Sequence, residues 1–404
     1  MKPARAASDG GRGWVLLTDA EERSTLAACR ALTTAGYSVA AIAGRRPAAT
    51  HWSRYCRARL EGPDPLVDPL GFVDRLEQLV AERTYAVLIP ATDAALLAIS
   101  EHRSRLDGRT LTGLPPHENV VRSLDKPHLL EEAARAGLPP PATRSCASED
   151  EAVEAARELG FPLGLKPTRS IVQSGSSRRL RTMLVVNGEA ELLAALPDYG
   201  SPVTLQQLES FRSILSCSGV IANGELLAIT AARARRTYPR FAGTFTFAET
   251  IRLSPEVLEQ MLAFVRATGW QGIFQTDTLE TNDGRLALID FNPRLFSSIA
   301  LDVAAGANLP AVWCDWLLHR DPPAARARAG FRYRWEEGEL RAFADYLRRR
   351  RLRPALSVLR PRRRTTHAFL SITDPGPFCL EVLVLTRRAF ARALRAATRR
   401  ERGD

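Results

Sequence analysis

Lysine is nearly absent from this sequence. Of the 56 basic residues in the 404-residue chain, 53 are arginine, and only Lys2, Lys126 and Lys166 are lysine. An ammonium group is a compact point charge on a flexible stem, and the planar fork of arginine does not replace it at a tight phosphate site. Since Lys2 lies near a terminus, the two interior lysines are the candidate phosphate ligands. The alternative, that Lys126 and Lys166 are present by chance on a solvated surface, explains them equally well.

Long apolar runs and paired cysteine motifs are also missing. No run approaches the roughly 18 apolar residues of a membrane span, and "WVLL" at 14–17 is too short for the apolar core of a signal peptide. The six cysteines, at positions 29, 56, 146, 217, 314 and 379, form no CxxC or CxxH motif. This scatter argues against a structural zinc site or a disulfide framework and suits a reducing compartment. We therefore expect a cytoplasmic protein.

Excess positive charge is confined to the end of the chain. Residues 321–404 hold 21 Arg against 9 Asp and Glu, a net charge of +12, whereas the preceding 320 residues hold 35 basic and 36 acidic residues. The segment could meet an anionic partner or a membrane surface, or it could be a solvated face in an arginine-rich chain. Nucleic acid is disfavoured, because no aromatic interleaving or nucleic-acid motif accompanies the charge.

Strands and helices alternate in the first part of the chain. Buried strands are expected at 14–18, 37–44 and 85–90, with helices at 19–36 and 69–83 between them. Alternation of this kind predicts a parallel sheet with helical crossovers. No G-x-G-x-x-G follows the first strand, so we expect no dinucleotide site there.

The second part predicts a mixture of antiparallel strands and helices. Helices are expected at 123–137, 148–160 and 254–269, and a hairpin at 170–186. The basic strip "ARARRTYPR" at 232–240 is expected to form a loop at the edge of a sheet. Its arginines, Arg235 and Arg236 above all, could hold a carboxylate through bidentate hydrogen bonds, although a solvated basic loop is the plainer alternative.

One stretch, "GIFQTDTLETNDGRLALIDFNPR" at 272–294, predicts a hairpin that turns at Asp-Gly. Asp277 lies in its first strand, and Asp290 and Asn292 lie two residues apart at the end of its second, so all three can share one face. Two carboxylates and an amide oxygen form the hard oxygen site that Mg²⁺ prefers beside phosphates. Arg294 follows and can hold a phosphate or an acyl phosphate. An ordinary hairpin with a polar face is the alternative.

These features, taken in order, resemble the ATP-grasp superfamily. Its last metal strand commonly has an acid, a hydrophobe and Asn-Pro-Arg, as in "DFNPR" at 290–294. Asp125-Lys126 matches the start of its first lysine helix, "AGLPPP" at 136–141 its Gly-hydrophobe-Pro segment, and "PLGLKP" at 162–167 its second lysine strand. A finer likeness to predicted ATP-dependent carboligases rests on "WSRYC", "RARRTYPRFAG", "FRYRW" and "DPGP".

The resemblance implies an α/β chain with an α+β catalytic part. A Rossmann-like parallel-sheet domain, the pre-ATP-grasp domain, would occupy residues 1–113. The ATP-grasp fold would occupy 114–319, in two subdomains of about 114–200 and 201–319. An Arg-rich extension would follow at 320–404.

It also implies roles for individual residues. Lys126 and Lys166 would contact the ATP phosphates. Mg²⁺, with Mn²⁺ as the alternative, would be held by Asp277, Asp290 and Asn292. The hinge Gln206, Gln207, Leu208 and Glu209 would contact adenine or ribose. Leu279 and Ile289 would line the adenine, although a core role explains both equally well.

The sequence departs from the family pattern in four places. The hinge has Gln206-Gln207 where Gln-Glu is common, so the contact could pass to Glu209. Both metal acids are Asp rather than Glu. Gln275 stands where related ligases often have Arg. The flexible phosphate loop "QSGSS" at 173–177 has less glycine than many.

The expected function is an ATP-dependent carboxylate–amine ligase that acts through an acyl phosphate and takes a small-molecule or peptide carboxylate and an amine. Arg294, Arg235 and Arg236 are the candidate catalytic arginines. The alternatives are a small-molecule kinase on the same fold and a non-catalytic nucleotide-binding module, against which the intact set of lysines and metal ligands argues. A biotin carboxylase is disfavoured because no biotin-carrier motif is present. The sequence leaves the oligomeric state and both substrates open.

Overall fold

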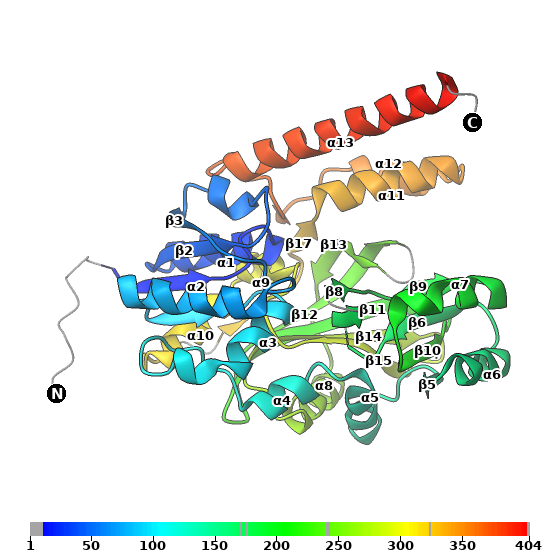
Figure 1. The fold of residues 1–404 in the computed structure, drawn as a ribbon, viewed down its shortest axis with the longest axis horizontal. Coiled ribbons are helices and arrows are strands. Elements are labelled where there is room, and N and C mark those ends of the chain that lie inside the picture. The colour runs from blue at the N-terminus through cyan, green and yellow to red at the C-terminus, as the bar shows by residue number, and fades with distance from the viewer. Residues whose placement is uncertain (1–10, 170, 175–176, 240–242, 323–324, 402–404) are drawn as a thin grey trace.

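Three main sheets organise the chain (Figure 1). The computed structural model describes residues 11–169, 171–174, 177–239, 243–322 and 325–401, and describes the side chains of these residues except those of 172–178 and 392–401. The three sheets follow one another along the sequence, so each can be taken in turn.

The first sheet is parallel, as the alternating pattern predicts, with the strand order β3-β2-β1-β4. Its strands are β1 (Trp14–Leu17), β2 (Ser38–Ala43), β3 (Cys56–Glu61) and β4 (Val87–Ile89). Its helices are α1 (Arg23–Thr34), α2 (Pro69–Glu82) and α3 (Asp93–Glu101), with short 3₁₀ turns η1 (Ala49–Trp52) and η2 (Arg103–Arg105). Val15, Leu16 and Leu17 of β1 are fully buried, because a parallel sheet is covered on both faces.

Two helices then lead to the second sheet. These are α4 (His117–Arg122) and α5 (Lys126–Arg135). Asp125 caps α5, because its carboxylate accepts a hydrogen bond from the backbone N–H of His128 at 3.2 Å. The cap fixes Lys126 at the first position of the helix.

The second sheet is antiparallel and has the order β5-β10-β6-β9. Its strands are β5 (Thr143–Cys146), β6 (Leu163–Pro167), β9 (Leu184–Val186) and β10 (Val203–Gln207), and its helices are α6 (Glu149–Leu159) and α7 (Glu189–Tyr199). A separate ribbon is formed by β7 (Ile171–Ser174) and β8 (Ser177–Leu180). Gly175 and Ser176 of the expected phosphate loop lie outside the described residues.

The third sheet is the largest and has the order β15-β14-β11-β12-β13-β17-β18, with β16 beside β12. Its strands are β11 (Phe211–Ala222), β12 (Glu225–Tyr238), β13 (Thr244–Thr250), β14 (Gly272–Thr281), β15 (Leu286–Asn292), β16 (Ala325–Arg326), β17 (Arg332–Arg334) and β18 (Thr365–His367). Its helices are α8 (Pro255–Ala267), α9 (Ile299–Ala305) and α10 (Leu309–Leu317). Since β16, β17 and β18 come from beyond residue 319, the C-terminal extension shares this sheet.

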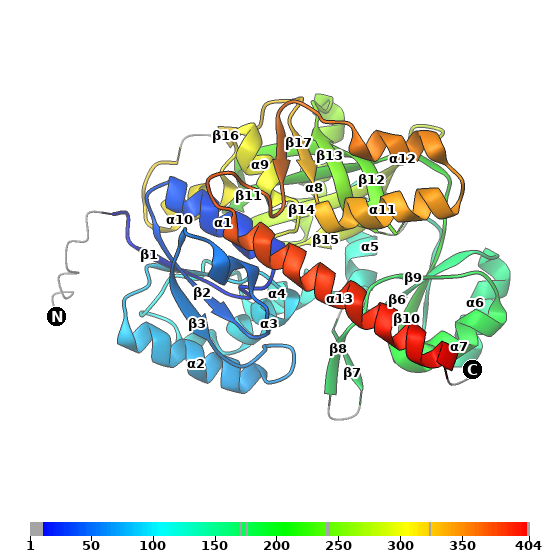
Figure 2. The same ribbon diagram turned by 90° about the horizontal axis from the view of Figure 1, so that it is seen from above.

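The C-terminal extension continues into three helices, α11 (Glu336–Arg348), α12 (Leu352–Leu359) and α13 (Gly376–Glu401). They lie together on one side of the molecule, opposite α4, α5 and α8 (Figure 1), and α13 crosses the body obliquely when it is seen from above (Figure 2). Asp374 fixes the start of α13: its buried carboxylate accepts hydrogen bonds from Arg30 Nε at 2.8 Å, Ser53 Oγ at 2.7 Å and the Arg54 backbone N–H at 2.9 Å.

The described helices include none that is both long enough and apolar enough to cross a lipid bilayer.

The expected loop at 232–240 is wrong in its described part. Residues 232–238 belong to β12, which is hydrogen-bonded to β11 on one side and β13 on the other. Repulsion among the arginines does not prevent strand formation, because Arg233, Arg235 and Arg236 each pair with an acid outside the strand. Arg240 lies outside the described residues.

Candidate active site

The hairpin of β14 and β15 places the predicted metal residues on one face. Asp277 lies directly across from Asp290 in the strand register, and Asn292 lies across from Gln275. The Nδ2 of Asn292 donates a hydrogen bond to Asp290 Oδ2 at 3.2 Å, which leaves its amide oxygen free for a cation. Asp290 is exposed, so a cation could reach it from solvent.

The carboxylate of Asp277 forms no ion pair with any described residue. Its Oδ1 is buried and has no hydrogen-bond partner in the described part of the chain. Burial, with the neighbouring negative charge of Asp290, raises the pKa of Asp277 to about 7, against the lowering effect of Ser216. A buried carboxylate oxygen without a partner, opposite a second acid in the strand register, fits a divalent cation. Within the described part of the chain no group of three or more His, Cys, Asp or Glu side chains could hold a metal ion, so water and phosphate oxygens would have to complete the shell.

We expect Asp277→Asn to stabilise the metal-free protein at neutral pH. The pKa of Asp277 is raised on folding, so the wild-type protein loses stability as the pH rises from about 4 to about 7, while an amide has nothing to ionise. At pH 8 the melting temperature of the variant should therefore exceed that of the wild type by roughly 1–2 °C for each kcal/mol of stability gained. Melting curves recorded with a chelator across this range provide the test, and a difference that does not change with pH would contradict it.

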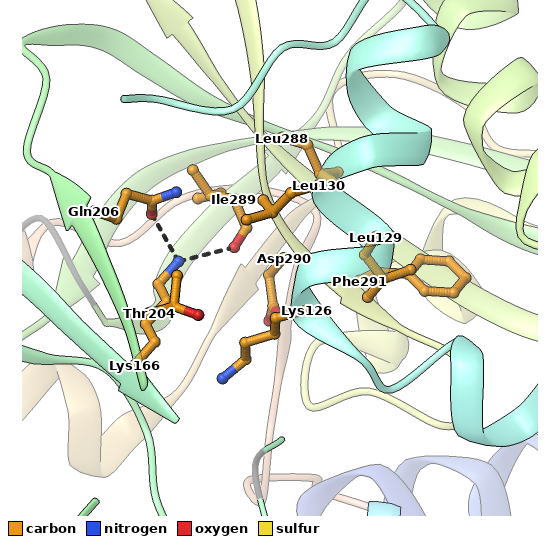
Figure 3. A pocket seen from close by; sticks show the side chains of 10 residues that line it. All are labelled: Lys126, Leu129, Leu130, Lys166, Thr204, Gln206, Leu288, Ile289, Asp290 and Phe291. Carbon is orange, nitrogen blue, oxygen red and sulfur yellow. Dashed lines mark hydrogen bonds between the residues drawn. The ribbon is translucent and has the colours of Figure 1, made fainter. Parts of the chain in front are cut away.

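Both interior lysines point into the same region (Figure 3). Lys166, on β6, donates from Nζ to Gln206 Oε1 at 2.7 Å and to the backbone oxygen of Ile289 at 3.3 Å. Lys126, on α5, donates to the backbone oxygen of Pro167 at 3.1 Å. Lys166 therefore bridges the second and third sheets, and Lys126 lies beside the same strand end.

The two ammonium groups are poorly solvated. Burial, together with the nearby charge of Lys126, lowers the pKa of Lys166 to about 8, against the opposing effect of Asp290. Burial also lowers the pKa of Lys126, against the opposing effects of Asp290 and Asp93. Two desolvated cations side by side favour an anionic ligand, because such a ligand would relieve their mutual repulsion.

A cavity of about 380 Å³, counted with its open mouth, lies where these elements meet. It is lined by Lys126, Leu129, Leu130, Lys166, Thr204, Gln206, Leu288, Ile289, Asp290 and Phe291. Apolar walls with a few charged groups at one end are typical of a small-molecule site. The leucines, Phe291 and Thr204 were not predicted, since nothing in their local sequence distinguishes them from core residues.

The remaining predicted nucleotide residues are divided between this cavity and its surroundings. Gln206 is buried beside Lys166, and its Nε2 donates to Thr143 Oγ1 at 3.1 Å. Gln207 is exposed and donates to the backbone oxygen of Leu159 at 3.2 Å. Leu208 and Glu209 follow β10, and Glu209 lies 3.7 Å from Arg285.

The two apolar residues predicted to line the adenine, Leu279 and Ile289, differ in their surroundings. Ile289 lines the cavity, whereas Leu279 is 6% exposed and packs in a core cluster with Phe245 and Tyr333. An adenine contact for Leu279 stays a prediction.

Arg294 lies at the junction with the first sheet. Its Nε donates to Asp93 Oδ1 at 2.5 Å, and its Nη1 donates to the backbone oxygen of Leu295 at 3.0 Å. Burial lowers the pKa of Arg294, but Asp93 first and Asp290 after it raise the pKa on balance. No role for Asp93 was predicted from the sequence. Two signals were present: Asp93 follows a buried strand, and Thr92 before it is a typical residue for the start of a helix.

The basic strip gives its arginines partners within the protein. Arg235 pairs with Glu249 at 3.2 Å and remains 45% exposed. Arg236 is 9% exposed, and its Nη1 donates to both oxygens of Glu339, at 2.9 and 2.6 Å, while its Nη2 donates to Ser357 Oγ at 3.0 Å. Glu339 belongs to α11, so Arg236 joins the sheet to the C-terminal extension.

We expect Arg236→Ala to unfold the protein more readily rather than to weaken substrate binding alone. The change would remove the two hydrogen bonds that Arg236 donates to the buried Glu339 and leave it with Arg334 at 3.8 Å and the hydroxyl of Thr246. Breaking a buried ion pair costs about 3–5 kcal/mol when no other partner remains, so the loss here should lie at or below that range. Arg235→Ala is the matched control, because an exposed pair contributes about 0–1 kcal/mol. Denaturant unfolding of both variants measures this. Wild-type stability of Arg236→Ala, with a raised KM for a carboxylate, would instead support the predicted substrate role.

Gln275 occupies the position where an arginine was expected from related ligases. It is 6% exposed, and its Nε2 donates to Ser216 Oγ at 3.1 Å and Ser298 Oγ at 3.2 Å. A neutral amide held by two hydroxyl groups brings no positive charge to this face. Arg294 lies two residues beyond the end of β15 and is the arginine nearest to Asp290 in the sequence.

Known structures with a similar fold include several ligases. N5-carboxyaminoimidazole synthetase from Staphylococcus aureus superposes with a TM-score of 0.57 at 11% identity, over 78% of this chain and 79% of that one. L-amino acid ligase from Bacillus licheniformis gives 0.56 at 16% identity, over 76% and 74%. The biotin carboxylase domain of 2-oxoglutarate carboxylase from Hydrogenobacter thermophilus, crystallised with MgADP and bicarbonate, gives 0.61 at 16% identity, over 79% and 73%.

At the level of sequence, no protein-family model matches the chain. A search of curated proteins likewise finds no match.

Proposed function

The chain has the ATP-grasp fold, and from that premise we propose that it is an ATP-dependent carboxylate–amine ligase. The observation that carries the proposal is the convergence of Lys126, Lys166 and Asp290 on one cavity, with the orphan oxygen of Asp277 on the opposing strand. The three elements that supply these groups, α5, β6 and β15, are distant in the sequence. Their meeting is a property of the fold.

ATP would place its phosphates against the two lysines and its base in the apolar part of the cavity. Leu129, Leu288, Ile289 and Phe291 supply apolar surface there, and Gln206 supplies an amide. The hinge residues Gln207, Leu208 and Glu209 follow at the end of β10, where they can contact adenine or ribose.

Asp277, Asp290 and the amide oxygen of Asn292 would hold Mg²⁺ or Mn²⁺. Such an ion, when bound, neutralises charge on the transferred phosphoryl group. The protein's own contribution is to hold three oxygen ligands on one face of a rigid hairpin, with Lys166 nearby.

We propose that the reaction has two steps. A carboxylate oxygen of the first substrate bonds to the γ-phosphorus as the bond to ADP breaks. An amine nitrogen then bonds to the acyl carbon, phosphate leaves with the C–O electron pair, and the amine gives up a proton. Arg294 would orient the carboxylate or acyl phosphate, since a guanidinium binds either in two-pronged fashion. Catalysis by positioning and charge neutralisation requires no cysteine or serine nucleophile.

A screen of carboxylate and amine pairs for ADP release tests the proposal. A true pair should release ADP and phosphate only when both partners are present, and mass spectrometry should find the condensed product. Hydroxylamine in place of the amine should give a hydroxamate, because it traps an acyl phosphate. A stable phosphorylated product without amine-dependent phosphate release would replace the ligase with a kinase on the same fold.

A further inference from the structure

The helix α12 exposes a stripe of leucines. Leu352, Leu356 and Leu359 are 64%, 61% and 61% exposed. At 100° per residue they lie within about 60° of one another around the helix axis. Ala355 and Val358 are the buried residues of the helix; Ala355 lies at the edge of the leucine stripe, about 40° from Leu359, and Val358 lies a further 60° round the axis. A short helix with three of its largest apolar side chains in water has left its most hydrophobic face without a partner.

This stripe points away from the body of the protein. Ser357 of the same helix accepts the hydrogen bond from Arg236 of β12, so the side that carries Ser357 faces the sheet. The centre of the leucine stripe lies about 130° round the axis from Ser357. Packing against the third sheet therefore cannot cover these leucines.

Neighbouring helices extend the same kind of surface. Leu340 and Leu347 of α11 are 59% and 44% exposed, and Leu383 and Phe390 of α13 are 51% and 73% exposed. Leu383 and Phe390 lie two turns apart on one side of α13, and the exposed Arg387 stands between them on that side. All three helices lie on one side of the molecule (Figure 1).

The surface is also strongly basic. Eleven exposed arginines of the extension make no ion pair with any described residue: Arg326, Arg328, Arg348, Arg350, Arg351, Arg353, Arg360, Arg362, Arg363, Arg364 and Arg387. By contrast, the acids Glu336, Glu337, Glu339 and Asp374 of the extension are bonded to groups within the protein. The positive charge of residues 321–404 is therefore directed outward, and the negative charge is largely turned inward.

We infer that the helices α11, α12 and α13 form a surface that binds an anionic lipid bilayer from one side. Leucines would enter the boundary between headgroups and acyl chains, and the arginines around them would meet lipid phosphates. Arginine suits this place because its apolar stem lies along the chains while the guanidinium remains at the phosphates. Charge favours a bilayer as the binding partner, because a surface with arginines around leucines is complementary to anionic headgroups above apolar acyl chains.

Two other occupants fit less well. A second copy of this chain would bring the same arginines against one another, and like charges directly opposed cost free energy. Nucleic acid would use the charge but not the leucines, because phosphate contacts and base stacking need cations and aromatic rings. The inference does not depend on the proposed ligase function, since the surface lies away from α5 and the cavity beside it.

Co-sedimentation of the full chain with lipid vesicles tests the inference. We expect binding to phosphatidylcholine vesicles that contain phosphatidylglycerol, little binding to pure phosphatidylcholine, and release at high salt. The triple variant Leu352→Ser, Leu356→Ser, Leu359→Ser should bind at least about tenfold more weakly, because apolar insertion adds to electrostatic attraction. Val67→Ser with Leu70→Ser is the matched control, because these exposed apolar residues lie in the first domain.

A second variant separates charge from apolar area. Replacing Arg350, Arg353, Arg360 and Arg363 with serine should weaken binding by at least about tenfold and remove most of its dependence on salt. Melting temperature and ATP-dependent turnover, where present, should stay at wild-type values in all variants. Absence of binding to anionic vesicles would overturn the inference, as would equal binding to neutral ones. Salt-sensitive binding to polyglutamate but not to vesicles would replace the bilayer with an acidic protein.

Discussion

Asp290→Asn is expected to abolish ATP-dependent turnover while leaving the fold intact. Asp290 is exposed at the end of β15, so its replacement by an amide of equal size disturbs no packing. It is also the carboxylate that faces both Asp277 and Asn292. A bound metal supplies several kcal/mol of charge stabilisation, and losing it should lower the rate by about 10³-fold or more.

The control for this change is Asp283→Asn, in the turn of the same hairpin. Asp283 is 59% exposed and pairs with Arg285, far along the strands from the cavity. Both variants should remain folded, and only Asp290→Asn should lose the thermal stabilisation that ATP and Mg²⁺ together give. Near-normal turnover of Asp290→Asn at ordinary Mg²⁺ concentrations would show that the acid pair is not the metal site.

Lys166→Arg should impair ATP binding and turnover severely even though the charge is kept. The ammonium is held between Gln206 Oε1 and the backbone oxygen of Ile289, a place sized for one nitrogen. A guanidinium is longer and wider, so it would push β15 away from β6 and misplace the groups on both. A misplacement of about 1 Å can cost about 10²-fold in rate.

Arg157→Lys makes the opposite exchange at a surface site as a control. Arg157 is 67% exposed on α6 and pairs with Glu189, so little should change. Isothermal titration with ATP and a rate measurement distinguish binding from turnover. Wild-type affinity and rate in the Lys166→Arg variant would mean that plain positive charge was sufficient, and that the scarcity of lysine carried no information.

The sequence predicted the fold and the acid pair well because both depend on short-range patterns. The hairpin around Asp277 and Asp290 has its register set by the Asp-Gly turn a few residues away, and the structure pairs these two acids directly. The parallel sheet likewise follows from apolar strands alternating with helices.

Long-range pairs could not be predicted in this way. Arg236 meets Glu339 across 103 residues, and Arg294 meets Asp93 across 201 residues. The residues around each arginine do not indicate its partner, because either arginine could pair with any of the many acidic residues of the chain. The basic strip was interpreted as a loop for the same reason: its neighbours β11 and β13, and the acids that neutralise it, lie elsewhere in the chain.

The anchor at Asp374 has a consequence for the order in which the protein is made. Arg30, Ser53 and Arg54 lie beside the first sheet and are synthesised early, yet their shared partner lies 344 residues after Arg30. During synthesis the first sheet can form from its own strands, since its ladder is local. The surface around Arg30 therefore cannot reach its final form before Asp374 has been synthesised. A residue that follows all three sheets in the sequence thus completes the packing around the first of them.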